Sequence, residues 1–589
     1  MRRQLTIFII FLFLFLSVMT HAQEASFRSV HQEQNQYYQS LGSLTIEKYD
    51  SINEFKGIIE QDSPGDCTLE KIVFGYEPYW GGSRFLNYQW NLLSDLCWFS
   101  YEVDPNTGDP ITTHDWLTAD PVDSAQANGV RVHLCVTLFS SHSTFFSSQQ
   151  SQQTLIDNLI DLVVQRNADG VNIDFEAVPS SQAQYLMDFI VDLSTQFHQS
   201  LPESLLSIAM PAVDWNQMYD IDVLKDHVDL FIIMGYDYYW NGSSQAGPVD
   251  PLYSLTAGYD YNLSRTLSYY QTQGIPLSKM VLGLPYYARQ WETVNNIVPS
   301  GTIGNGYALT YFNVKNNSNG YYDPENRYWE ENSFSQYFVF NSGGWHQCFA
   351  PSVRSLSQRY DIVNLRNLAG IGIWALGYDE GYTELWDLIE NKLTDCMVMP
   401  DNDTIYDSGG PSWNYYHNED YVITIELENA LSLSLHFSSF ELEDEYDSLW
   451  IYDGADTSAQ LIGGYSGSNG PGSVYASDNV ITLRFHSDAN TSKMGWEAVW
   501  NNEPYAVEET GGGSEMVLYP NPASDQVTIR CKMQDTRCRM IEVFSISGML
   551  IERYINKSEI DVSDLPDGLY IVRLQTGNEI AMVKLVVVH

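Results

Sequence analysis

The sequence predicts an α/β protein: a (β/α)8 TIM barrel followed by two smaller β-domains. Eight short runs rich in β-branched and aromatic residues alternate with amphipathic stretches between residues 71 and 374. This order is typical of parallel strands joined by crossover helices. After Cys396, strand-like runs continue without helical patterns between them. A chain of 589 residues is also too long for a single hydrophobic core.

The eight predicted strands can be placed individually. They are the runs at 71–76, 96–101, 130–137, 170–176, 205–210, 230–236, 280–285 and 369–374. Amphipathic stretches such as 153–165, 182–198 and 263–272 fall between them, and eight such units close into a barrel. The interval 286–367 separates the last two strands and is too long for one helix. It therefore predicts a small α+β insertion.

The N-terminus predicts export. Arg2 and Arg3 precede the apolar run 7–18, and small residues stand before a cleavage point after Ala22. Residues 1–22 are therefore predicted to be a signal peptide. This run is too short for a transmembrane helix, and no later stretch of the sequence reaches the length of about 20 apolar residues that a span needs. We expect no stable membrane span.

Shifts in composition predict the domain boundaries. Residues 23–66 are polar, with a helix-like stretch at 32–40, and form a lead-in segment to which the sequence assigns no function. The barrel is expected at 67–397 and a β-sandwich at 399–502. The remaining predicted segments are a Gly-rich linker at 503–515 and a small β-domain at 516–589.

Composition narrows the range of partners. Acidic residues outnumber basic ones by 75 to 29, for a formal charge of −46, which disfavours nucleic acid and anionic bilayers. A neutral polymer or a divalent cation fits this balance better. Of the seven cysteines, Cys97 and Cys135 lie in strand-like apolar runs where a free thiol is expected, and no Cys/His cluster has zinc-ligand spacing. The fold is not expected to depend on disulfides.

One predicted strand carries acidic side chains on a single face. In the run 169–176, alternation places Asn172, Asp174 and Glu176 on one side and apolar residues on the other. The polar face then points into the barrel, where unpaired carboxylates are costly unless they have a role. Carboxylates at i and i+2 lie ~6.6 Å apart along a strand, close enough to raise each other's proton affinity. One of them can then serve as a general acid.

These residues resemble a known family signature. The run Asp169-Gly-Val-Asn-Ile-Asp-Phe-Glu176 resembles the Asp-Gly-x-Asp-x-Asp-x-Glu signature of glycoside hydrolase family 18. Met234-Gly-Tyr-Asp237, Gly283-Leu-Pro-Tyr-Tyr-Ala-Arg289 and Trp374 resemble its motifs on the sixth, seventh and eighth strands. The resemblance extends from about residue 71 to 393. It implies a chitinase-like glycosidase that needs no cofactor for catalysis.

The resemblance implies substrate-assisted hydrolysis with retention, in which the N-acetyl oxygen of the sugar replaces an enzyme nucleophile. Glu176 would protonate the leaving oxygen, and Asp174 would orient the acetamido group and stabilise the oxazolinium ion. Tyr236 would hydrogen-bond the acetamido carbonyl, Asp237 would support the sugar, and Trp374 would form the floor beneath it. The implied substrate-binding residues besides Trp374 are Asn172, Met234, Tyr76 and Tyr286.

Asn172 departs from the commonest family pattern, in which this position is Asp. An amide can hydrogen-bond Asp174 but cannot share a proton with it, so we expect a different pH dependence. The variant motif resembles the branch that contains spore-cortex glucosaminidases and chitobiase-like enzymes.

Two further resemblances follow the barrel. Tyr446-Asp-Ser-Leu-Trp-Ile-Tyr-Asp-Gly454, within 408–500, resembles a CUB domain, which implies a possible calcium site at Glu443, Asp447 and Asp488. The alternative is that these are ordinary loop acids. Tyr519-Pro-Asn-Pro-Ala-Ser-Asp525 and its following motifs resemble a type IX secretion system C-terminal sorting domain. That implies contact with secretion machinery and a secreted protein, extracellular or on the cell surface of a Gram-negative bacterium.

The leading hypothesis is a secreted hydrolase of β-1,4-linked N-acetylglucosamine polymers, either chitin or chitooligosaccharides. An endo-N-acetylglucosaminidase acting on peptidoglycan or N-glycan cores is the alternative within the same class. A non-catalytic glycan-binding lectin or adhesin is disfavoured, because lectin-like relatives typically lack the terminal Glu of the motif and Glu176 is present.

Overall fold

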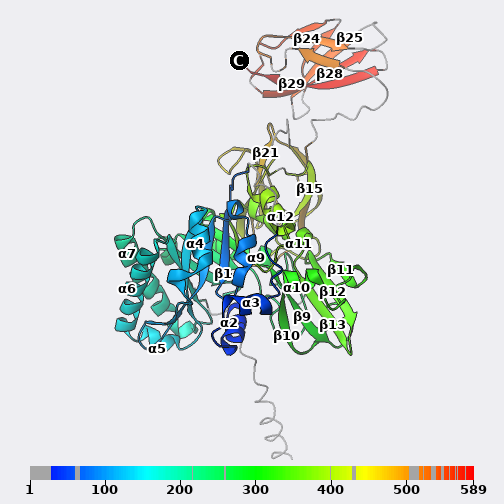
Figure 1. Ribbon diagram of the computed structural model, residues 1–589. Helices are drawn as coiled ribbons and strands as arrows, with labels where there is room; N and C mark the ends of the chain where they lie inside the picture. The colour runs from blue at the N-terminus through cyan, green and yellow to red at the C-terminus, as the bar shows by residue number, and fades with distance from the viewer. Residues whose placement is uncertain are drawn as a thin grey trace, which may run out of the picture.

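The computed structural model describes residues 28–59, 67–214, 217–257, 261–397, 399–427, 433–502 and most of 516–588. The predicted signal peptide and the predicted linker 503–515 lie outside the described residues. Figure 1 shows the barrel, the sandwich beside it and the C-terminal sheets beyond the sandwich.

Eight parallel strands form a closed barrel. They are β1 (Ile72–Pro78), β2 (Asp95–Val103), β4 (Arg131–Leu138), β5 (Gly170–Phe175), β6 (Leu205–Pro211), β7 (Leu230–Met234), β8 (Met280–Pro285) and β14 (Gly370–Trp374). Their order is β1-β14-β8-β7-β6-β5-β4-β2, and β1 pairs with β2 to close the ring. A short strand, β3 (Pro110–Thr112), adds to β2 in antiparallel sense. The predicted barrel is confirmed, and every predicted strand is one of the eight.

The barrel helices form because their sequences repeat apolar residues every three or four positions. In α7 (Ala183–Ser200), for example, Leu186, Phe189, Leu193 and Phe197 are all buried. The other helices after β2 are α4 (Asp120–Ala127), α5 (His142–Phe146), α6 (Gln149–Arg166), α8 (Ile221–Leu224), α9 (Leu263–Thr272), α11 (Val353–Leu365) and α12 (Glu384–Leu393). These helices cover the outer face of the strands, as Figure 1 shows for α6 and α7.

An α+β unit is inserted after β8. Its elements are β9 (Tyr287–Thr293), β10 (Thr302–Thr310), α10 (Tyr311–Asn316), β11 (Arg327–Glu330), β12 (Ser335–Asn341) and β13 (Trp345–Ala350), with sheet order β10-β9-β13-β12-β11. A small core of its own, with Tyr322, Phe338 and Phe340, holds the unit together. The unit ends before α11, which returns the chain to β14. It stands beside the barrel mouth, where β9 leaves β8.

Residues 28–59, called here the N-terminal segment, contain α2 (Val30–Ser40) and α3 (Ile46–Ile52). The helix-like stretch expected at 32–40 is thus part of α2. Ser29 caps α2 by accepting a hydrogen bond from the backbone N–H of Gln32. In Figure 1 the two helices lie between the barrel and the inserted sheet, and α3 packs against the short helix η2 (Gly82–Asn87).

A disulfide that the sequence did not predict joins Cys67 to Cys396. The two residues lie just before β1 and just after α12, so the bond fastens the two ends of the barrel domain together. Their separation of 329 residues gives no local signal for pairing. Cys97, Cys135 and Cys348 are free and buried, as was expected of the first two.

Two four-stranded sheets form the sandwich after the barrel. One contains β15 (Asn402–Tyr406), β22 (Gly495–Asn501), β17 (Ser434–Glu441) and β20 (Ser473–Tyr475), and the other contains β16 (Asp420–Glu426), β21 (Val480–His486), β18 (Ser448–Asp453) and β19 (Gln460–Tyr465). Alternate residues point inward, and Trp496, Trp500 and Phe485 are buried between the sheets.

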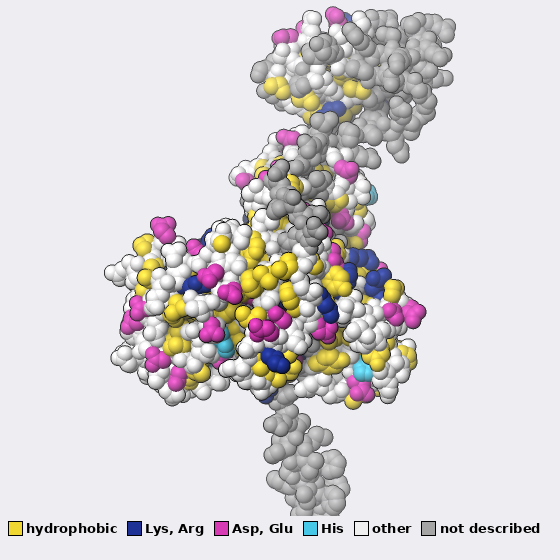
Figure 2. Space-filling view, in the orientation of Figure 1, with side chains coloured by type: hydrophobic (Ala, Val, Ile, Leu, Met, Phe, Trp, Pro, Cys, Tyr) yellow, Lys and Arg dark blue, Asp and Glu magenta, His cyan; other side chains and the backbone are white. Residues whose placement is uncertain are grey.

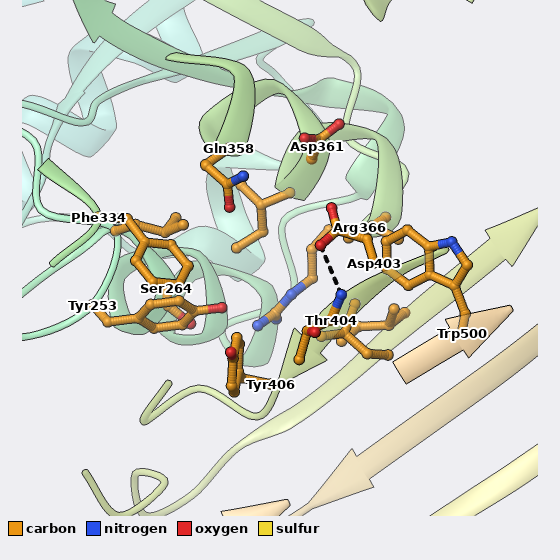
Figure 3. A pocket seen from close by; sticks show the side chains of 15 residues that line it. Tyr253, Ser264, Phe334, Gln358, Asp361, Arg366, Asp403, Thr404, Tyr406 and Trp500 are labelled. Carbon is orange, nitrogen blue, oxygen red and sulfur yellow. Dashed lines mark hydrogen bonds between the residues drawn. The ribbon is translucent and has the colours of Figure 1, made fainter. Parts of the chain in front are cut away.

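The sandwich packs directly on the barrel. The guanidinium of Arg366 lies 3.7 Å from the ring centroid of Tyr421, and Trp413 Nε1 donates to the carbonyl of Ser254 at 2.8 Å. A pocket at this boundary is lined by side chains from both domains, among them Tyr253, Gln358, Arg366, Tyr406 and Trp500 (Figure 3). None of the acidic residues of β5 lines it.

The C-terminal domain consists of two further sheets. They are β23 (Met516–Tyr519), β24 (Gln526–Cys531) and β27 (Glu559–Asp561), and β26 (Leu550–Ile555), β25 (Arg539–Ser545), β28 (Gly568–Thr576) and β29 (Glu579–Val587). Val527, Ile541, Val572 and Leu585 are fully buried between them. The predicted sequence of fold classes, barrel, sandwich and small β-domain, is therefore confirmed.

The surface reflects the acidic composition. On the face drawn in Figure 2, Asp and Glu side chains are widely scattered and Lys and Arg are fewer. No helix among the described residues is both long enough and apolar enough to cross a membrane.

Candidate active site

The polar face of β5 points into the barrel, as its alternation predicted. Asn172 and Asp174 are fully buried, and Glu176, the first residue after the strand, is 8% exposed at the barrel mouth. On the opposite face, Phe175 stacks on Phe189 of α7 with ring centroids 5.8 Å apart. The apolar side thus holds the strand against a helix while the carboxylates face the interior.

The two carboxylates converge on one point. His31 Nδ1 lies 2.9 Å from Asp174 Oδ2 and 3.2 Å from Glu176 Oε1. Burial and the nearby charge of Asp174 raise the pKa of Glu176, and His31 lowers it only in part. A carboxyl group with a raised pKa retains its proton closer to neutral pH, as a general acid requires. Asp174 Oδ1 is buried and has no hydrogen-bond partner among the described residues.

Tyr236 and Asp237 follow β7 and face the carboxylates. The Tyr236 hydroxyl lies 2.8 Å from His31 Nε2. Burial raises the pKa of Tyr236 well above its ordinary value, so its hydroxyl remains a neutral donor. Asp237 Oδ1 accepts hydrogen bonds from Tyr287 at 2.7 Å and from Arg289 at 3.0 Å. All four predicted catalytic side chains are therefore brought to one end of the barrel.

Trp374 ends β14, and its ring is fully buried beside that of Tyr76, 5.5 Å away between centroids. The Tyr76 hydroxyl donates to Asn172 Oδ1 at 3.1 Å, and Asn172 Nδ2 donates to Ser207 at 2.9 Å. The amide that replaces the usual acid is thus hydrogen-bonded on both sides. The position of the usual acid is therefore occupied by a neutral side chain with neutral partners.

Two predicted binding residues lie less directly in the site. The Tyr286 hydroxyl is 3.1 Å from that of Tyr360, so it points to α11 and not to the carboxylates. Met234 is buried at the end of β7, two residues before Tyr236. Tyr287 and Arg289, the hydrogen-bond donors to Asp237, were not among the predicted site residues, although both belong to the predicted motif at 283–289.

The residue that sequence reasoning missed most completely is His31. It belongs to α2 of the lead-in segment, far in sequence from every motif of the barrel. Burial alone would lower the pKa of His31, but Asp174 and Glu176 outweigh it and raise that pKa to about 9. The imidazole is therefore protonated near neutral pH and can donate from both nitrogens.

A second cluster of acids lies in the sandwich. Glu443, Asp447 and Asp488 bring one oxygen each to within 4.8 Å of one another. The backbone N–H of Asp488 donates to Asp447 Oδ1 at 2.8 Å, and the hydroxyl of Tyr415 donates to the other oxygen of Asp447. Glu443 Oε2 is buried without a hydrogen-bond partner among the described residues. Three hard oxygen donors and one orphaned carboxylate oxygen fit a calcium ion.

Family models match all three domains. The model for glycosyl hydrolases family 18 matches residues 88–379, the CUB domain model matches 395–500, and the secretion system C-terminal sorting domain model matches 517–588. These matches confirm the three resemblances that the motifs indicated.

Three curated relatives each match part of the chain. A Bacillus subtilis protein named as a sporulation-specific glycosylase is 27% identical over 240 residues, which cover 39% of this chain and 53% of that protein. A Caenorhabditis elegans protein named as an endochitinase is 25% identical over 258 residues, 40% of this chain and 41% of that protein. The chain thus spans about half the length of these relatives or less. Dog cubilin is 35% identical over 100 residues, 16% of this chain and 3% of cubilin.

Solved structures that the chain resembles include a family 18 chitinase from Cycas revoluta in complex with (GlcNAc)4. It has 16% identity and a TM-score of 0.49, with 55% of this chain and 99% of that chain covered. A family 18 N-acetylglucosaminidase from Paenibacillus barengoltzii has 18% identity and the same TM-score, with 55% of this chain and all of that chain covered.

Proposed function

We propose, for a chain whose barrel belongs to family 18 of the glycosyl hydrolases, that it cleaves β-1,4-linked N-acetylglucosamine polymers, chitin or chitooligosaccharides, by substrate-assisted retaining hydrolysis. The observation that carries this proposal is the buried pair of Asp174 and Glu176 at the mouth, with the Tyr236 hydroxyl facing both. Substrate-assisted hydrolysis of an acetamido sugar needs a carboxyl group with a raised pKa as the proton donor and a hydroxyl group that hydrogen-bonds the acetamido carbonyl.

In the first step, Glu176 gives its proton to the glycosidic oxygen as the bond to C1 breaks. The carbonyl oxygen of the 2-acetamido group attacks C1 and closes an oxazolinium ring. Asp174 Oδ1, which is buried and has no hydrogen-bond partner in the described part of the chain, accepts the acetamido N–H and balances the positive charge of the ring. The Tyr236 hydroxyl donates to the acetamido carbonyl and holds it beneath C1.

In the second step, water opens the ring. Glu176, now a carboxylate, takes a proton from the water, whose oxygen attacks C1 on the face that the leaving group vacated. The carbonyl and the proton on Glu176 are restored, and the configuration at C1 is retained. Trp374 supports the sugar from below, and Asp237, held by Tyr287 and Arg289, binds its hydroxyls.

Peptidoglycan is the second candidate substrate. Asn172 stands where the commonest motif has Asp, and the matched Bacillus subtilis protein is named as a sporulation-specific glycosylase. Cleavage of peptidoglycan would use the same side chains, because its N-acetylglucosamine residues carry the same acetamido group.

The substrate is tested by assaying chitin oligomers, peptidoglycan and an N-glycosylated protein side by side. Because α2 stands over the carboxylates, the assay uses both the natural chain and a Gln36→Pro chain, in which that helix is broken. We expect N-acetylated oligosaccharides from chitin oligomers, with the β-anomer formed first in proton NMR spectra. Release of the α-anomer first, or cleavage of none of the three substrates by either chain, would contradict the proposal.

We also propose that the CUB domain binds calcium through Glu443, Asp447 and Asp488. Removal of calcium by a chelator is expected to lower the melting temperature of this domain by about 5 °C, since a ligand that binds only the folded state stabilises it. Asp488→Asn should abolish the chelator effect, whereas Glu445→Gln, which changes an exposed acid in the loop that holds Glu443 and Asp447, should retain it. Differential scanning calorimetry of the full chain measures both, and an unchanged melting temperature on chelation excludes the site.

The C-terminal domain supports a proposal about location. A sorting domain at 517–588 favours passage through a secretion system. We infer that the protein is secreted, extracellular or on the cell surface of a Gram-negative bacterium, with the secretion machinery as its partner. The substrate polymer would then be met outside the cell.

A further inference from the structure

One side chain of the N-terminal segment fills the centre of the active site. His31 is fully buried, and its ring stacks on Trp374 with centroids 3.6 Å apart and planes inclined by 25°. Its Nδ1 contacts Asp174 and Glu176, and its Nε2 contacts the hydroxyl of Tyr236. A flat ring on Trp374 that reaches all three groups stands where the proposed mechanism puts the reacting sugar.

Neighbouring residues of α2 bind the other groups of the site. The backbone N–H of Val30 donates to Asp237 Oδ2 at 2.8 Å. Gln34 Oε1 accepts from Trp374 Nε1 at 2.9 Å and from the hydroxyl of Tyr378 at 2.8 Å. Each of the four catalytic side chains therefore has a contact with α2, and the floor tryptophan has two.

A second ring of α2 covers a second tryptophan. Tyr38 stacks on Trp80 with ring centroids 4.8 Å apart and ring planes inclined by 8°. Trp80 is fully buried. Near-parallel stacking on an aromatic ring is also how proteins hold sugar rings. On the other side of the helix, Glu33 forms an ion pair with Arg289 at 3.0 Å. The helix thus also contacts an aromatic and a charged side chain of the barrel domain beyond the four catalytic residues.

The segment is fastened to the barrel outside the site. Asp50, in α3, accepts hydrogen bonds from the backbone and the side chain of Ser83 at 2.6 and 2.7 Å. The backbone N–H of Lys56 donates to Glu380 Oε1 at 3.0 Å. Because α2 is held on the same chain as the site, its effective concentration there is about millimolar or higher, against which a free sugar must compete.

From these contacts we propose that the N-terminal segment is an intramolecular inhibitor that occupies the sugar-binding cleft and must be displaced before substrate binds. The inference rests on the proposed function, since it identifies His31 and Tyr38 as occupants of sugar positions. A different role for His31, as a residue that assists catalysis, is incompatible with its place on Trp374, because ring and sugar exclude each other.

The charge of His31 predicts how pH acts on the segment. The titratable groups that face its ring are Asp174, Glu176, Tyr236 and Tyr76. Docking raises the pKa of His31 from 6.5 to about 9. A group whose pKa is raised in the docked state stabilises docking fully below the lower value, and this stabilisation is lost as pH rises through the upper one. The contribution of the His31 charge to docking should therefore be lost, and the segment should loosen, as pH rises toward about 9.

Accessibility of the site tests the inference without any sugar. In the full chain, Glu176→Cys places a thiol beneath His31, and its alkylation by iodoacetamide is followed by mass spectrometry of the peptide that contains residue 176. Adding Gln36→Pro, on the exposed side of α2, breaks the helix without changing any side chain that touches the barrel. Gln36→Ala is the matched control, because alanine preserves the helix.

We expect alkylation to be about tenfold or more faster with Gln36→Pro than with Gln36→Ala, because the proline shifts the chain toward the open state. Equal alkylation rates would overturn the inference whatever the substrate is. The alkylation rate of Glu176→Cys with Gln36→Ala should be close to that of Glu176→Cys alone, which would show that the side chain of residue 36 does not control access.

Activity provides the second arm, with chitooligosaccharides as the probe. His31→Ala in the full chain is expected to raise the initial rate of hydrolysis about tenfold, and Gln36→Pro should raise it by a similar factor. A residue that assists catalysis would give a fall instead, and that fall would overturn the inference. If Gln36→Pro speeds alkylation but no variant hydrolyses chitooligosaccharides, the segment covers the site and the proposed substrate is refuted. Failure of the inference can therefore be distinguished from failure of the proposed function.

Discussion

Glu176→Gln is expected to lower kcat for chitooligosaccharide hydrolysis by about 10³-fold, because the amide has no proton to give to the leaving oxygen. The side chain keeps its size, so oligosaccharide binding should remain. The loss should appear in kcat and not in KM, since the interaction that is removed exists only in the transition state. Steady-state kinetics in a Gln36→Pro background, where the site is open, measure both constants.

Glu77 provides the matched control for this substitution. It is a buried carboxyl group of β1 whose pKa burial raises to about 8, and it is hydrogen-bonded to Tyr88 at 2.6 Å. It contacts neither carboxylate of β5 in the structure. Glu77→Gln should leave kcat within a few-fold of the parent, which would show that a raised pKa alone does not make a general acid. Equal activity in the two Gln variants would refute the role of Glu176.

Asp174→Asn is expected to lower kcat by about 10²-fold, since it removes the charge that would balance the oxazolinium ion. It should also change the pH profile. Burial is the larger cause of the raised pKa of Glu176, and the negative charge of Asp174 is the second. Without that charge, ionised Glu176 is less disfavoured and its pKa falls. Because the general acid acts only when protonated, the alkaline limb of kcat/KM should move to lower pH.

The control for the pH profile is Asn172→Ser, on the same face of β5. Asn172 is neutral, so its replacement removes no charge from the neighbourhood of Glu176, and the alkaline limb should stay where it is. The comparison separates the electrostatic effect of Asp174 from a general disturbance of the strand. An alkaline limb that does not move in Asp174→Asn would show that the two carboxylates are not coupled.

The strands of the barrel and the inward face of β5 could be predicted because both depend on local patterns. A strand alternates its side chains with period two, so Asn172, Asp174 and Glu176 had to share a face in any fold that kept this segment extended. The apolar residues between them had to meet a helix. The motifs at 234–237 and 283–289 then placed further polar groups after other strands, and parallel strands in a barrel bring those ends together.

Other contacts could not be predicted, because they join segments that no local pattern relates. Tyr287 and Arg289 meet Asp237 only because β9, which follows β8, passes beside the end of β7. Cys67 and Cys396 meet because the two ends of a closed barrel lie side by side.

Local patterns in the sequence were enough to predict the barrel, the sandwich, the small β-domain and the two carboxylates of the proposed reaction, with Glu176 as acid and base and Asp174 as the charge beside the oxazolinium ion. Periodicity and short motifs encode which face of an element is buried, and that information is present in a few consecutive residues. The position of His31, stacked on Trp374 and in contact with both carboxylates, becomes apparent only in the folded structure. The reason is that the position of α2 depends on the surface against which it packs. In this chain that surface forms only when the strands close into a barrel.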